Sequence, residues 1–450
     1  MVSWTKSCTA VISRKLYHYF WNTSPMTYKE ALDFLYGLEL FGVKLGLNNI
    51  TRFLNRLGNP QKSFKGIHIA GTNGKGSVAS IFESILHEAG YKVGKFTSPH
   101  LYNFRERFHL DKEKVDESFV AEFIKEHHEY IKASRTTFFE TCTGLAFELF
   151  RRNNVDYGVV EVGLGGRLDA TSLIEPELTV ITKIARDHIK TLGDSIAKIA
   201  FEKCGIIKEN IPLVTSVYDP EALQVIREVA EGKNAPLYCL LPENMVEVMS
   251  MSIEKMRFSF SENSIPPKNY VANLVGTHQA ENYGLALLGL KVLAQKGLEI
   301  PEDAYKSGVE NVFWPARMQF VPGKPNLILD CAHNPDGIRV LVQNVQAIYP
   351  GKKFVLLLSM LRRPDFPEIF AEVKKISDKI ILAIPDHDRA PQPEVLAREA
   401  IEARLNFKLI PDVLEAYKFS RELVDNDEIL LVVGSHFALG RIMKFENIPT

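Results

Sequence analysis

Apolar residues fall into two alternating patterns along most of the chain. Continuous apolar runs, such as residues 66–70, 157–163 and 178–184, are typical of short strands that are buried on both faces. Residues 28–41 instead carry apolar positions at helical spacing, and residues 78–90 predict a helix that ends at a glycine. Strands that alternate with helices predict parallel sheets with helices on both faces, so we expect an α/β fold.

The alternation occurs in two series. The first continues to a long predicted helix at residues 279–297, and the second contains predicted strands at 326–332, 353–360, 379–385, 407–411 and 428–434. Residues 298–317 between the series are interpreted as a hinge. Because 450 residues are too many for one ordinary core, we predict domains at 27–297 and 298–450, after an N-terminal extension of residues 1–26.

Composition excludes several classes of partner. The net charge is −1, so the chain as a whole has no electrostatic attraction to nucleic acid or to an anionic membrane. No apolar run approaches the length that a membrane-spanning helix needs. The five cysteines are scattered and include no C-x-x-C pair, which favours a reducing compartment. We therefore expect a cytoplasmic protein, a monomer, with neither nucleic acid nor membrane as a partner.

The segment HIAGTNGKGS, residues 68–77, follows a predicted strand and precedes a predicted helix, which is the setting of a phosphate-binding loop. It departs from the standard G-x-x-x-x-G-K-[ST] pattern, because Gly76 follows Lys75 and the hydroxyl comes one place later, at Ser77. A tight turn without a ligand is the alternative interpretation. We favour a nucleotide site formed by Gly71, Thr72, Asn73, Gly74, Lys75, Gly76 and Ser77.

Two further predicted strands of the first series lead to residues with ionisable side chains. Glu161 ends one apolar run, and His188 follows another. Because ligands of parallel sheets bind at the carboxyl ends of the strands, we expect both residues near the glycine-rich loop. A salt bridge for Glu161 and a satisfied histidine at 188 are the structural alternatives. Lys203 lies on a predicted helix, where an ordinary solvated lysine is the default interpretation.

Six blocks of sequence together resemble one enzyme family. They are HIAGTNGKGS, TSPHLYNFRERF, EVGLGGRLDAT, DHIKTLGDSIAKIAFEKCGI, FWPARMQ and DCAHNPDG. Their residues and order are similar to those of folylpolyglutamate synthase and its bifunctional dihydrofolate synthase form, in the Mur ligase superfamily. The resemblance extends from about residue 28 to about residue 440. It implies an ATP-binding, P-loop-type first domain and a smaller Rossmann-like second domain that contacts glutamate and ATP.

The resemblance also implies a metal site. Ser77 and Glu161 would bind a magnesium ion that bridges the ATP phosphates, and His188 would share a second magnesium ion with Glu161. Lys203 matches a family lysine that carries a carbamate. Lys75, His188, Lys203 and His333 are the catalytic residues that we expect on this basis.

Other matches concern the substrates. Thr137, Phe139 and Asp169 match positions that line a pterin pocket, where an aromatic ring and a carboxylate suit a flat ligand with polar edges. Asn282 matches a contact to the ATP base. Arg317 and Asp330 match residues that hold the ATP phosphates or ribose, and His333 and Ser435 match positions for the incoming glutamate or the nearby nucleotide.

The implied reaction is the ATP-dependent joining of L-glutamate to a reduced folate, through an acyl phosphate, with dihydropteroate as a further candidate acceptor. The residues leave open whether one or both acceptors are used, and whether Lys203 is modified. A Mur-type ligase acting on a UDP-muramyl substrate and a nucleotide-dependent binding switch are the alternatives.

Overall fold

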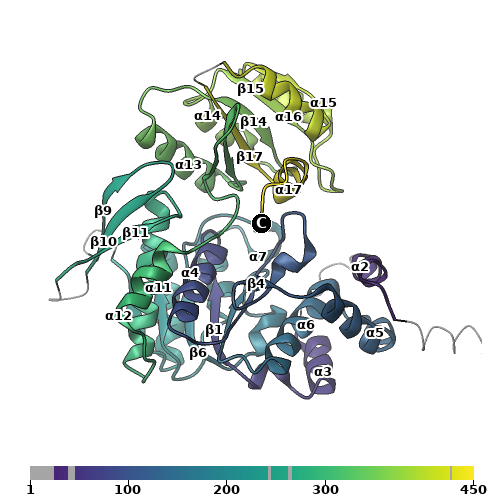
Figure 1. Ribbon diagram of the computed structural model, residues 1–450, viewed down its shortest axis with the longest axis vertical. Helices are drawn as coiled ribbons and strands as arrows, with labels where there is room; N and C mark the ends of the chain where they lie inside the picture. The colour runs from purple at the N-terminus through teal and green to yellow at the C-terminus, as the bar shows by residue number, and fades with distance from the viewer. Residues whose placement is uncertain (1–24, 39–45, 242–244, 262–265, 426–427) are drawn as a thin grey trace, which may run out of the picture.

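The computed structural model describes residues 25–38, 46–241, 245–261, 266–425 and 428–450, so most of the predicted extension at 1–26 lies outside the described residues (Figure 1). The first domain is built on an eight-stranded sheet in the order β4-β3-β2-β5-β1-β6-β7-β8. Its strands are β1 (Lys65–Ala70), β2 (Val93–Phe96), β3 (Phe108–Leu110), β4 (Glu113–Lys114), β5 (Tyr157–Glu161), β6 (Pro176–Ile181), β7 (Leu213–Thr215) and β8 (Leu237–Cys239). In this order, the neighbouring strands from β2 through β5, β1, β6 and β7 to β8 pair in parallel, as predicted. The β3–β4 hairpin adds an antiparallel edge beside β2.

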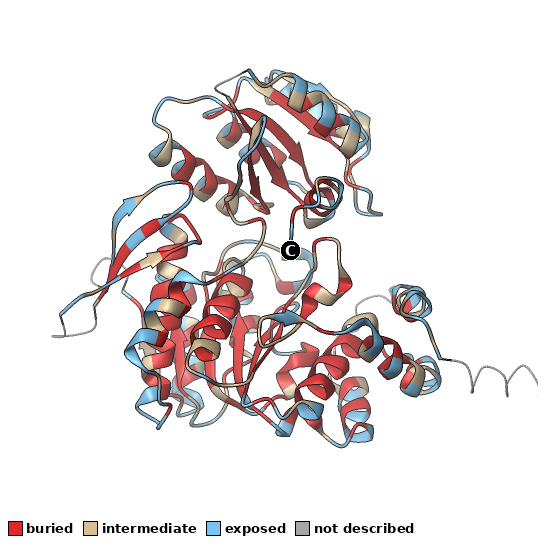
Figure 2. Ribbon diagram, in the orientation of Figure 1, coloured by how far each residue is buried: buried red, intermediate tan, exposed pale blue. Residues whose placement is uncertain are grey.

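Helices cover both faces of this sheet (Figures 1 and 2). They are α2 (Tyr28–Gly37), α3 (Asn48–Arg56), α4 (Lys75–Glu88), α5 (Glu117–Ser134), α6 (Phe138–Arg152), α7 (Ile189–Leu192), α8 (Ile196–Cys204), α9 (Pro220–Gly232), α11 (Thr277–Ala294) and α12 (Glu302–Glu310). Strand residues alternate between the faces. Ile69 of β1 and Val159 of β5 pack into one core with α4 and α11, while Val160 packs into another with α3 and α6.

The segment interpreted as a hinge, residues 298–317, is only partly a connection. Its middle forms helix α12, and Val309 of that helix is buried in the same core as α4. The interpretation failed there because a short amphipathic helix beside a proline resembles a linker in sequence. The packing favours a later boundary than residue 297, and we propose that the domains are joined by residues 311–318.

A small antiparallel sheet projects beside α11, and the sequence patterns did not predict it. It contains β9 (Val246–Met251), β10 (Met256–Phe260) and β11 (Lys268–Ala272), in the order β11-β10-β9. Phe258 is buried and stacks on Tyr283 of α11 at a centroid distance of 5.3 Å. The sheet therefore extends the first domain's core.

The second domain has the predicted Rossmann-like form. Its six strands are β12 (Gln319–Val321), β13 (Asn326–Asp330), β14 (Val355–Ser359), β15 (Lys379–Ala383), β16 (Phe407–Leu409) and β17 (Ile429–Gly434), in the order β12-β13-β17-β14-β15-β16. All pairs are parallel except β12–β13. The helices are α13 (Pro335–Ile348), α14 (Phe366–Val373), α15 (Pro393–Glu402), α16 (Val413–Glu422) and α17 (His436–Phe445), and they cover both faces of the sheet.

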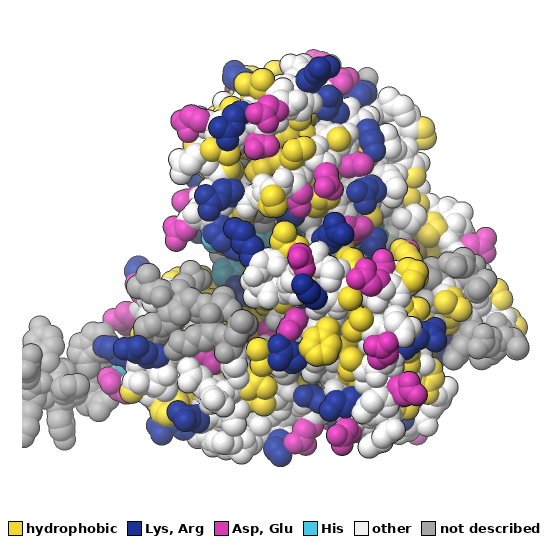
Figure 3. Space-filling model, turned by 180° about the vertical axis from the view of Figure 1, so that it is seen from behind, with side chains coloured by type: hydrophobic (Ala, Val, Ile, Leu, Met, Phe, Trp, Pro, Cys, Tyr) yellow, Lys and Arg dark blue, Asp and Glu magenta, His cyan; other side chains and the backbone are white. Residues whose placement is uncertain are grey.

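The two domains stack on one another, and the narrower region between them is called the waist below (Figure 1). Seen from behind, the waist carries several Lys and Arg side chains (Figure 3). Among the described residues, no helix combines the length and the apolar character that crossing a membrane requires.

Candidate active site

Three neighbouring strands deliver the predicted residues to one edge of the first sheet. In the parallel register, Ile69 of β1 pairs with Glu161 of β5, and Ala70 pairs with Ile181 of β6. The glycine-rich loop therefore starts beside Glu161 and beside the loop that leads from β6 to His188. This is the carboxyl edge, where parallel sheets bind their ligands.

The glycine-rich loop is fastened to the end of β6. The Thr72 N–H donates to the Lys183 carbonyl at 2.8 Å, and the Thr182 hydroxyl donates to the Asn73 carbonyl at 2.8 Å. Gly71 and Gly74 have φ values of 152° and 92°, which favour glycine. Gly74 precedes α4 without a side-chain cap, so the first N–H groups of that helix are available to an anion.

Two glycines of the loop also lie against other elements. A Cβ at Gly74 would lie 2.6 Å from Oδ1 of Asn282, which places the predicted base contact on α11 directly against the loop. A Cβ at Gly76 would lie 2.5 Å from the ring of Trp314. The departure from the standard motif at Gly76 thus has a steric reason, because the indole occupies the space that a side chain would need.

Lys75 and Glu161 face each other beneath the loop. Lys75 Nζ lies 3.8 Å from Glu161 Oε1, and the Ser98 N–H donates to Oε2 at 3.1 Å. Burial raises the pKa of Glu161, although Lys75, the Ser98 N–H and Arg317 act in the opposite direction. The hydroxyl-bearing Ser77 lies on the first turn of α4 and is buried. The Glu161 carboxylate is costly to keep charged in this buried position unless a cation compensates it.

Lys203 and His188 lie close enough to Lys75 for its charge to affect both. Lys203 is buried, and its ammonium donates to the Gly71 carbonyl at 2.7 Å. Burial, reinforced by the charge of Lys75, lowers the pKa of Lys203 to about 7. Burial also lowers the pKa of His188, and the charges of Lys75 and Lys203 act in the same direction. Lys203 is thus not the solvated lysine of the default interpretation.

The second domain meets this edge through His333. Nε2 of His333 lies 3.7 Å from Oδ2 of Asp187, while Nδ1 bonds to the Cys331 carbonyl at 2.9 Å and therefore carries the proton. Burial alone would raise the pKa of Asp187, but the nearby imidazoles of His333 and His188 hold it well below its usual range.

A second contact joins the domains through the phosphate loop itself. Asn73 Nδ2 donates to Asp336 Oδ2 at 3.0 Å, and Asn334 Nδ2 donates to Asn73 Oδ1 at 3.0 Å. Lys183 Nζ lies 3.0 Å from Asp336 Oδ1. Asn334 also caps α13 by accepting from the Gly337 N–H. Asn334 therefore serves the helix cap and the interdomain contact at the same time.

Arg317 and Asp330 lie beside the domain connection. Asp330 ends β13, and its carboxylate accepts from the N–H groups of Met318 and Ala332 at 2.8 and 2.7 Å. Burial raises its pKa, and the Arg317 guanidinium opposes that shift. Ser435 precedes α17 and caps it by accepting from the Ala438 N–H at 3.3 Å.

Phe139 and Asp169 contact the glycine-rich segment 163–166 that follows Glu161, and Thr137 lies two residues before Phe139 in the chain. The Phe139 ring packs where a Cβ at Gly163 would lie, at 2.4 Å, and Thr137 caps α6. Asp169 accepts from the Leu164 N–H, the Thr171 N–H and the Thr171 hydroxyl. Burial raises the pKa of Asp169 against these hydrogen bonds. Phe139 and Asp169 thus help to shape this segment.

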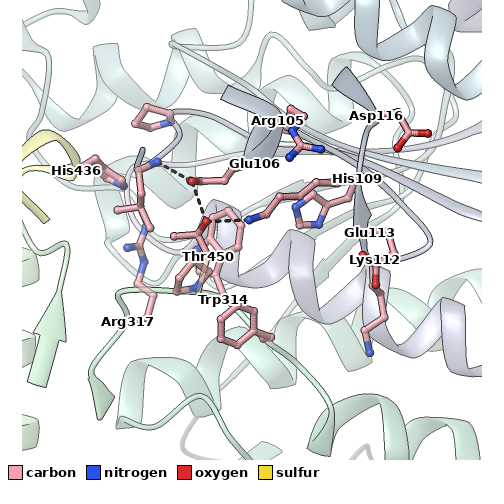
Figure 4. Close-up of a pocket in the computed structure, with 15 residues that line it drawn as sticks. Arg105, Glu106, His109, Lys112, Glu113, Asp116, Trp314, Arg317, His436 and Thr450 are labelled. Atoms are coloured by element: carbon pink, nitrogen blue, oxygen red, sulfur yellow. Dashed lines mark hydrogen bonds between the residues drawn. The ribbon is translucent and has the colours of Figure 1, made fainter. Parts of the chain in front are cut away.

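A cavity of about 470 Å³ opens between the domains behind the connection (Figure 4). Trp314, Arg317 and His436 line it on one side, and the β3–β4 hairpin lines it on the other. Glu106, within the cavity wall, accepts from the Thr450 hydroxyl at 2.9 Å, which ties the last described residue to the first domain.

Some residues of this site were absent from the sequence prediction. Asp187, Asn334 and Asp336 contact His333, Asn73 or Lys183 across the domain interface. An acid directly before His188 at a strand end is a usable signal for Asp187. Nothing in the local pattern identifies Asp336, because its partners are far away in sequence.

Comparison with known proteins assigns the family. The Mur ligase middle domain model matches residues 69–289, and the Mur ligase glutamate ligase domain model matches residues 316–436. A Bacillus subtilis dihydrofolate synthase/folylpolyglutamate synthase is 34% identical over 425 residues, which cover 93% of this chain and 98% of that protein. An Escherichia coli protein of the same name is 31% identical and is covered to 94%, with 92% of this chain matched.

Solved structures agree over nearly the whole chain. Escherichia coli FolC in complex with DHPP and ADP superposes with a TM-score of 0.80 at 29% identity, covering 95% of this chain and 98% of that one. Mycobacterium tuberculosis folylpolyglutamate synthase complexed with ADP and AMPPCP gives 0.81 at 28% identity, with 92% and 98% covered. Since both domains match at full length and in the same order, the chain belongs to the dihydrofolate synthase/folylpolyglutamate synthase family of Mur ligases.

Proposed function

We propose that this protein is an ATP-dependent, ADP-forming ligase that joins L-glutamate to a reduced folate, and also to dihydropteroate. The observation that carries the proposal is the meeting of Lys75, Glu161 and Lys203 at one sheet edge, with His333 of the second domain facing them through Asp187. The family relationship supports the same reaction over the UDP-muramyl alternative. We further propose a cytoplasmic monomer whose partners are these small molecules.

In the first step, a carboxylate oxygen of the acceptor attacks the γ-phosphorus of ATP, and ADP leaves. Lys75 and the free N–H groups at the start of α4 are placed to bind the phosphate oxygens. Arg317 lies close enough to Glu161 to affect its pKa and would add positive charge on the same side. Asn282, against Gly74, would contact the base, and Asp330 the ribose or phosphates. Such fixed charges lower the barrier to phosphoryl transfer.

The residues at this edge fit magnesium that arrives with the nucleotide. Among the described residues, no group of three or more His, Cys, Asp or Glu side chains could hold a metal ion by itself. Magnesium in nucleotide sites commonly has one or two protein ligands, with phosphates and water completing its shell. Ser77 and Glu161 would hold one ion, and Glu161 and His188 a second. When bound, these ions would supply positive charge at the transferring phosphate.

Lys203 is suited to become a carbamate. A neutral amine is needed to attack CO₂, with loss of one proton as the N–C bond forms and a carbamate anion results. A pKa of about 7 leaves much of Lys203 neutral at physiological pH, unlike an ordinary lysine. The change would replace a cation that Lys75 repels with an anion that Lys75 attracts.

In the second step, the amino group of glutamate attacks the acyl carbon, and phosphate leaves as the amide bond forms. His333, placed at the interface by Asp187 and the Cys331 carbonyl, and Ser435 are proposed to position the incoming amino acid. The pterin part of the acceptor would lie in the pocket of Thr137, Phe139 and Asp169, where Phe139 offers an aromatic face. The closed domains would keep water from the acyl phosphate.

The test is a steady-state assay of phosphate release, run with dihydropteroate and with a reduced folate in parallel. We expect release that requires both an acceptor and L-glutamate. Hydrolysis of ATP at the same rate without glutamate would contradict the proposal and would favour a nucleotide-dependent switch. Lys75→Ala should lower the glutamate-dependent rate by roughly 10²-fold or more while the protein stays folded.

A further inference from the structure

A buried ion pair beneath the phosphate-loop helix has no part in the mechanism above. Lys95 of β2 and Glu83 of α4 are 1% and 4% exposed, and Lys95 Nζ lies 2.5 Å from Glu83 Oε2. The ammonium also donates to Ser80 Oγ at 3.0 Å. Nδ1 of His109 lies 3.4 Å from Glu83 Oε1. A buried ion pair rarely stabilises a fold more than apolar side chains of the same volume would. Stability alone therefore does not explain why this pair is present.

The Lys95 ammonium also lies over an aromatic ring in the domain connection. Nζ is 5.1 Å from the centroid of the Trp314 ring, and the Arg317 guanidinium is 6.0 Å from the same ring. Both distances are within the range of cation–π attraction. A single indole thus joins a fixed charge of the first domain to the arginine that the proposed mechanism places at the ATP phosphates.

Packing and charge are what hold Trp314 in place. Its ring fills the space above Gly76, where a Cβ would be 2.5 Å away. Its Nε1 is buried and has no hydrogen-bond partner among the described residues. The ring is therefore held by packing against Gly76 and the first domain's core and by the Lys95 ammonium, and a shift of the ring would displace Arg317 relative to the phosphate loop.

We infer that Lys95 is a positioning residue, which acts through Trp314 to hold Arg317 beside the phosphate loop. Glu83 and Ser80 hold the ammonium by hydrogen bonds, and the centroid of the indole ring lies 5.1 Å from it. The inference rests on the proposed function for the role of Arg317. It adds a link between the buried face of α4 and the connection between the domains.

The test removes the charged pair without leaving either partner alone. The double variant Lys95→Met/Glu83→Met keeps the volume and is expected to stay folded, because both charges go together. We expect the KM for ATP and the Kd for ATP to rise about fivefold to tenfold. Lys379→Met, which breaks a pair in the second domain with Glu428, is the control and should keep the wild-type KM. A folded double variant with wild-type ATP affinity would overturn the inference.

A second comparison separates positioning from a general loss of structure. In an Arg317→Ala background, the same double substitution should change the Kd for ATP less than twofold, since the residue through which Lys95 acts is gone. An equal fivefold to tenfold rise of the Kd for ATP in both backgrounds would overturn the inference. If the double variant does not fold, Trp314→Phe replaces it. The same rise of the Kd for ATP is expected, and the same comparison is made in the Arg317→Ala background. Because ATP binding is measured directly, a wild-type protein that binds ATP without ligating glutamate would contradict the proposed function alone.

Discussion

Charged side chains at the carboxyl edge of the first sheet lie in surroundings that disfavour their charge. Burial raises the pKa of Glu161 and lowers the pKa of Lys203, so each shift favours the neutral form. Groups that are costly to keep charged are common at sites that bind charged ligands, because the ligand supplies the missing partner. At this scale, the site reduces the stability of the ligand-free protein.

This cost can be measured at Glu161. Its raised pKa means that the native state holds the proton to higher pH than the unfolded chain does, so the stability from this group is lost as pH rises through the folded pKa. At pH 7 without ligands, Glu161→Gln should therefore raise the Tm by a few degrees. Thermal unfolding followed by circular dichroism checks this. Addition of Mg²⁺ and ATP should stabilise the wild type more than the variant.

The matched control is Glu148→Gln. Glu148 is also a buried glutamate, and burial alone would raise its pKa, but the hydrogen bonds from Arg151 and Arg152 outweigh burial and lower it. Its substitution should lower the Tm at pH 7. A lower Tm for both variants would mean that Glu161 is an ordinary structural ion pair.

Lys203 gives a prediction about pH. Because its pKa is lowered to about 7, the neutral amine becomes the main form as pH rises from 6 to 8, whereas a solvated lysine stays protonated. Carbamate formation from ¹³C-labelled CO₂ should therefore increase strongly over this range. Nuclear magnetic resonance of the wild type and of Lys203→Arg, which should give no such signal, checks it. A carbamate signal that persists in the variant would assign the modification elsewhere.

At the scale of elements, helix α4 carries much of the site. It begins after Gly74, brings Lys75 and Ser77 to the nucleotide edge, and places Glu83 two turns further along. The glycine is needed for its φ of 92° and also for its contact with Asn282. The start of helix α4 therefore packs closely against the long helix α11.

Two glycine substitutions separate these effects. Gly74→Ala should destabilise the protein by about 2–3 kcal/mol, through positive φ and the clash with Asn282. Gly90→Ala has a similar φ of 88° but open space around its Cβ, so it should cost about 1 kcal/mol. Urea denaturation of both variants is the measurement. Equal losses in the free energy of unfolding for the two variants would show that Asn282 does not constrain the loop.

The elements that the sequence predicted are those with strong local patterns. The unit of β1, loop and α4 was predicted because Ile67 and Ile69 form an apolar run directly before the glycines. Strands β9–β11 were missed because they form a separate antiparallel sheet outside the strand–helix alternation, and its buried residues, such as Phe258, are covered by a helix that is distant in sequence. Helix α12 was interpreted as part of a hinge because its nine residues follow a proline. Local patterns do not contain the tertiary partner that stabilises such segments.

The same limit applies to the candidate site. That Glu161 would lie near the loop followed from the parallel pattern, because the carboxyl ends of parallel strands share one edge, and the pairing of β1 with β5 confirms it. The contacts of Asn73 with Asn334 and Asp336 join residues more than 260 positions apart, so no window of sequence contains them. The roles of the predicted residues in binding ATP, glutamate and the pterin stay predictions.

At the scale of the whole molecule, the two domains meet through polar contacts at the site itself. Asp336 bonds to Asn73 of the phosphate loop and pairs with Lys183. On the other side of the waist, Tyr102 donates to the Ile448 carbonyl at 3.1 Å. The nucleotide loop thus touches the second domain directly, and this couples nucleotide binding to the domain arrangement.

Substitution of Asp336 tests this coupling. Asp336→Ala removes both contacts but leaves the helix cap of Asn334, so the fold should persist. Because partly exposed polar pairs contribute about 1 kcal/mol, we expect the KM for ATP to change by about fivefold. Small-angle X-ray scattering should show a larger radius of gyration than in the wild type. An unchanged radius and an unchanged KM would mean that the domains are held together elsewhere.

In the proposed reaction, the acceptor carboxylate is activated as an acyl phosphate before glutamate attacks. Synthesis from an acceptor labelled with ¹⁸O in that carboxylate, followed by mass spectrometry of the released phosphate, tests it most directly. In the presence of glutamate, we expect one ¹⁸O atom in each phosphate released. Phosphate without the label, released together with the glutamate adduct, would contradict it.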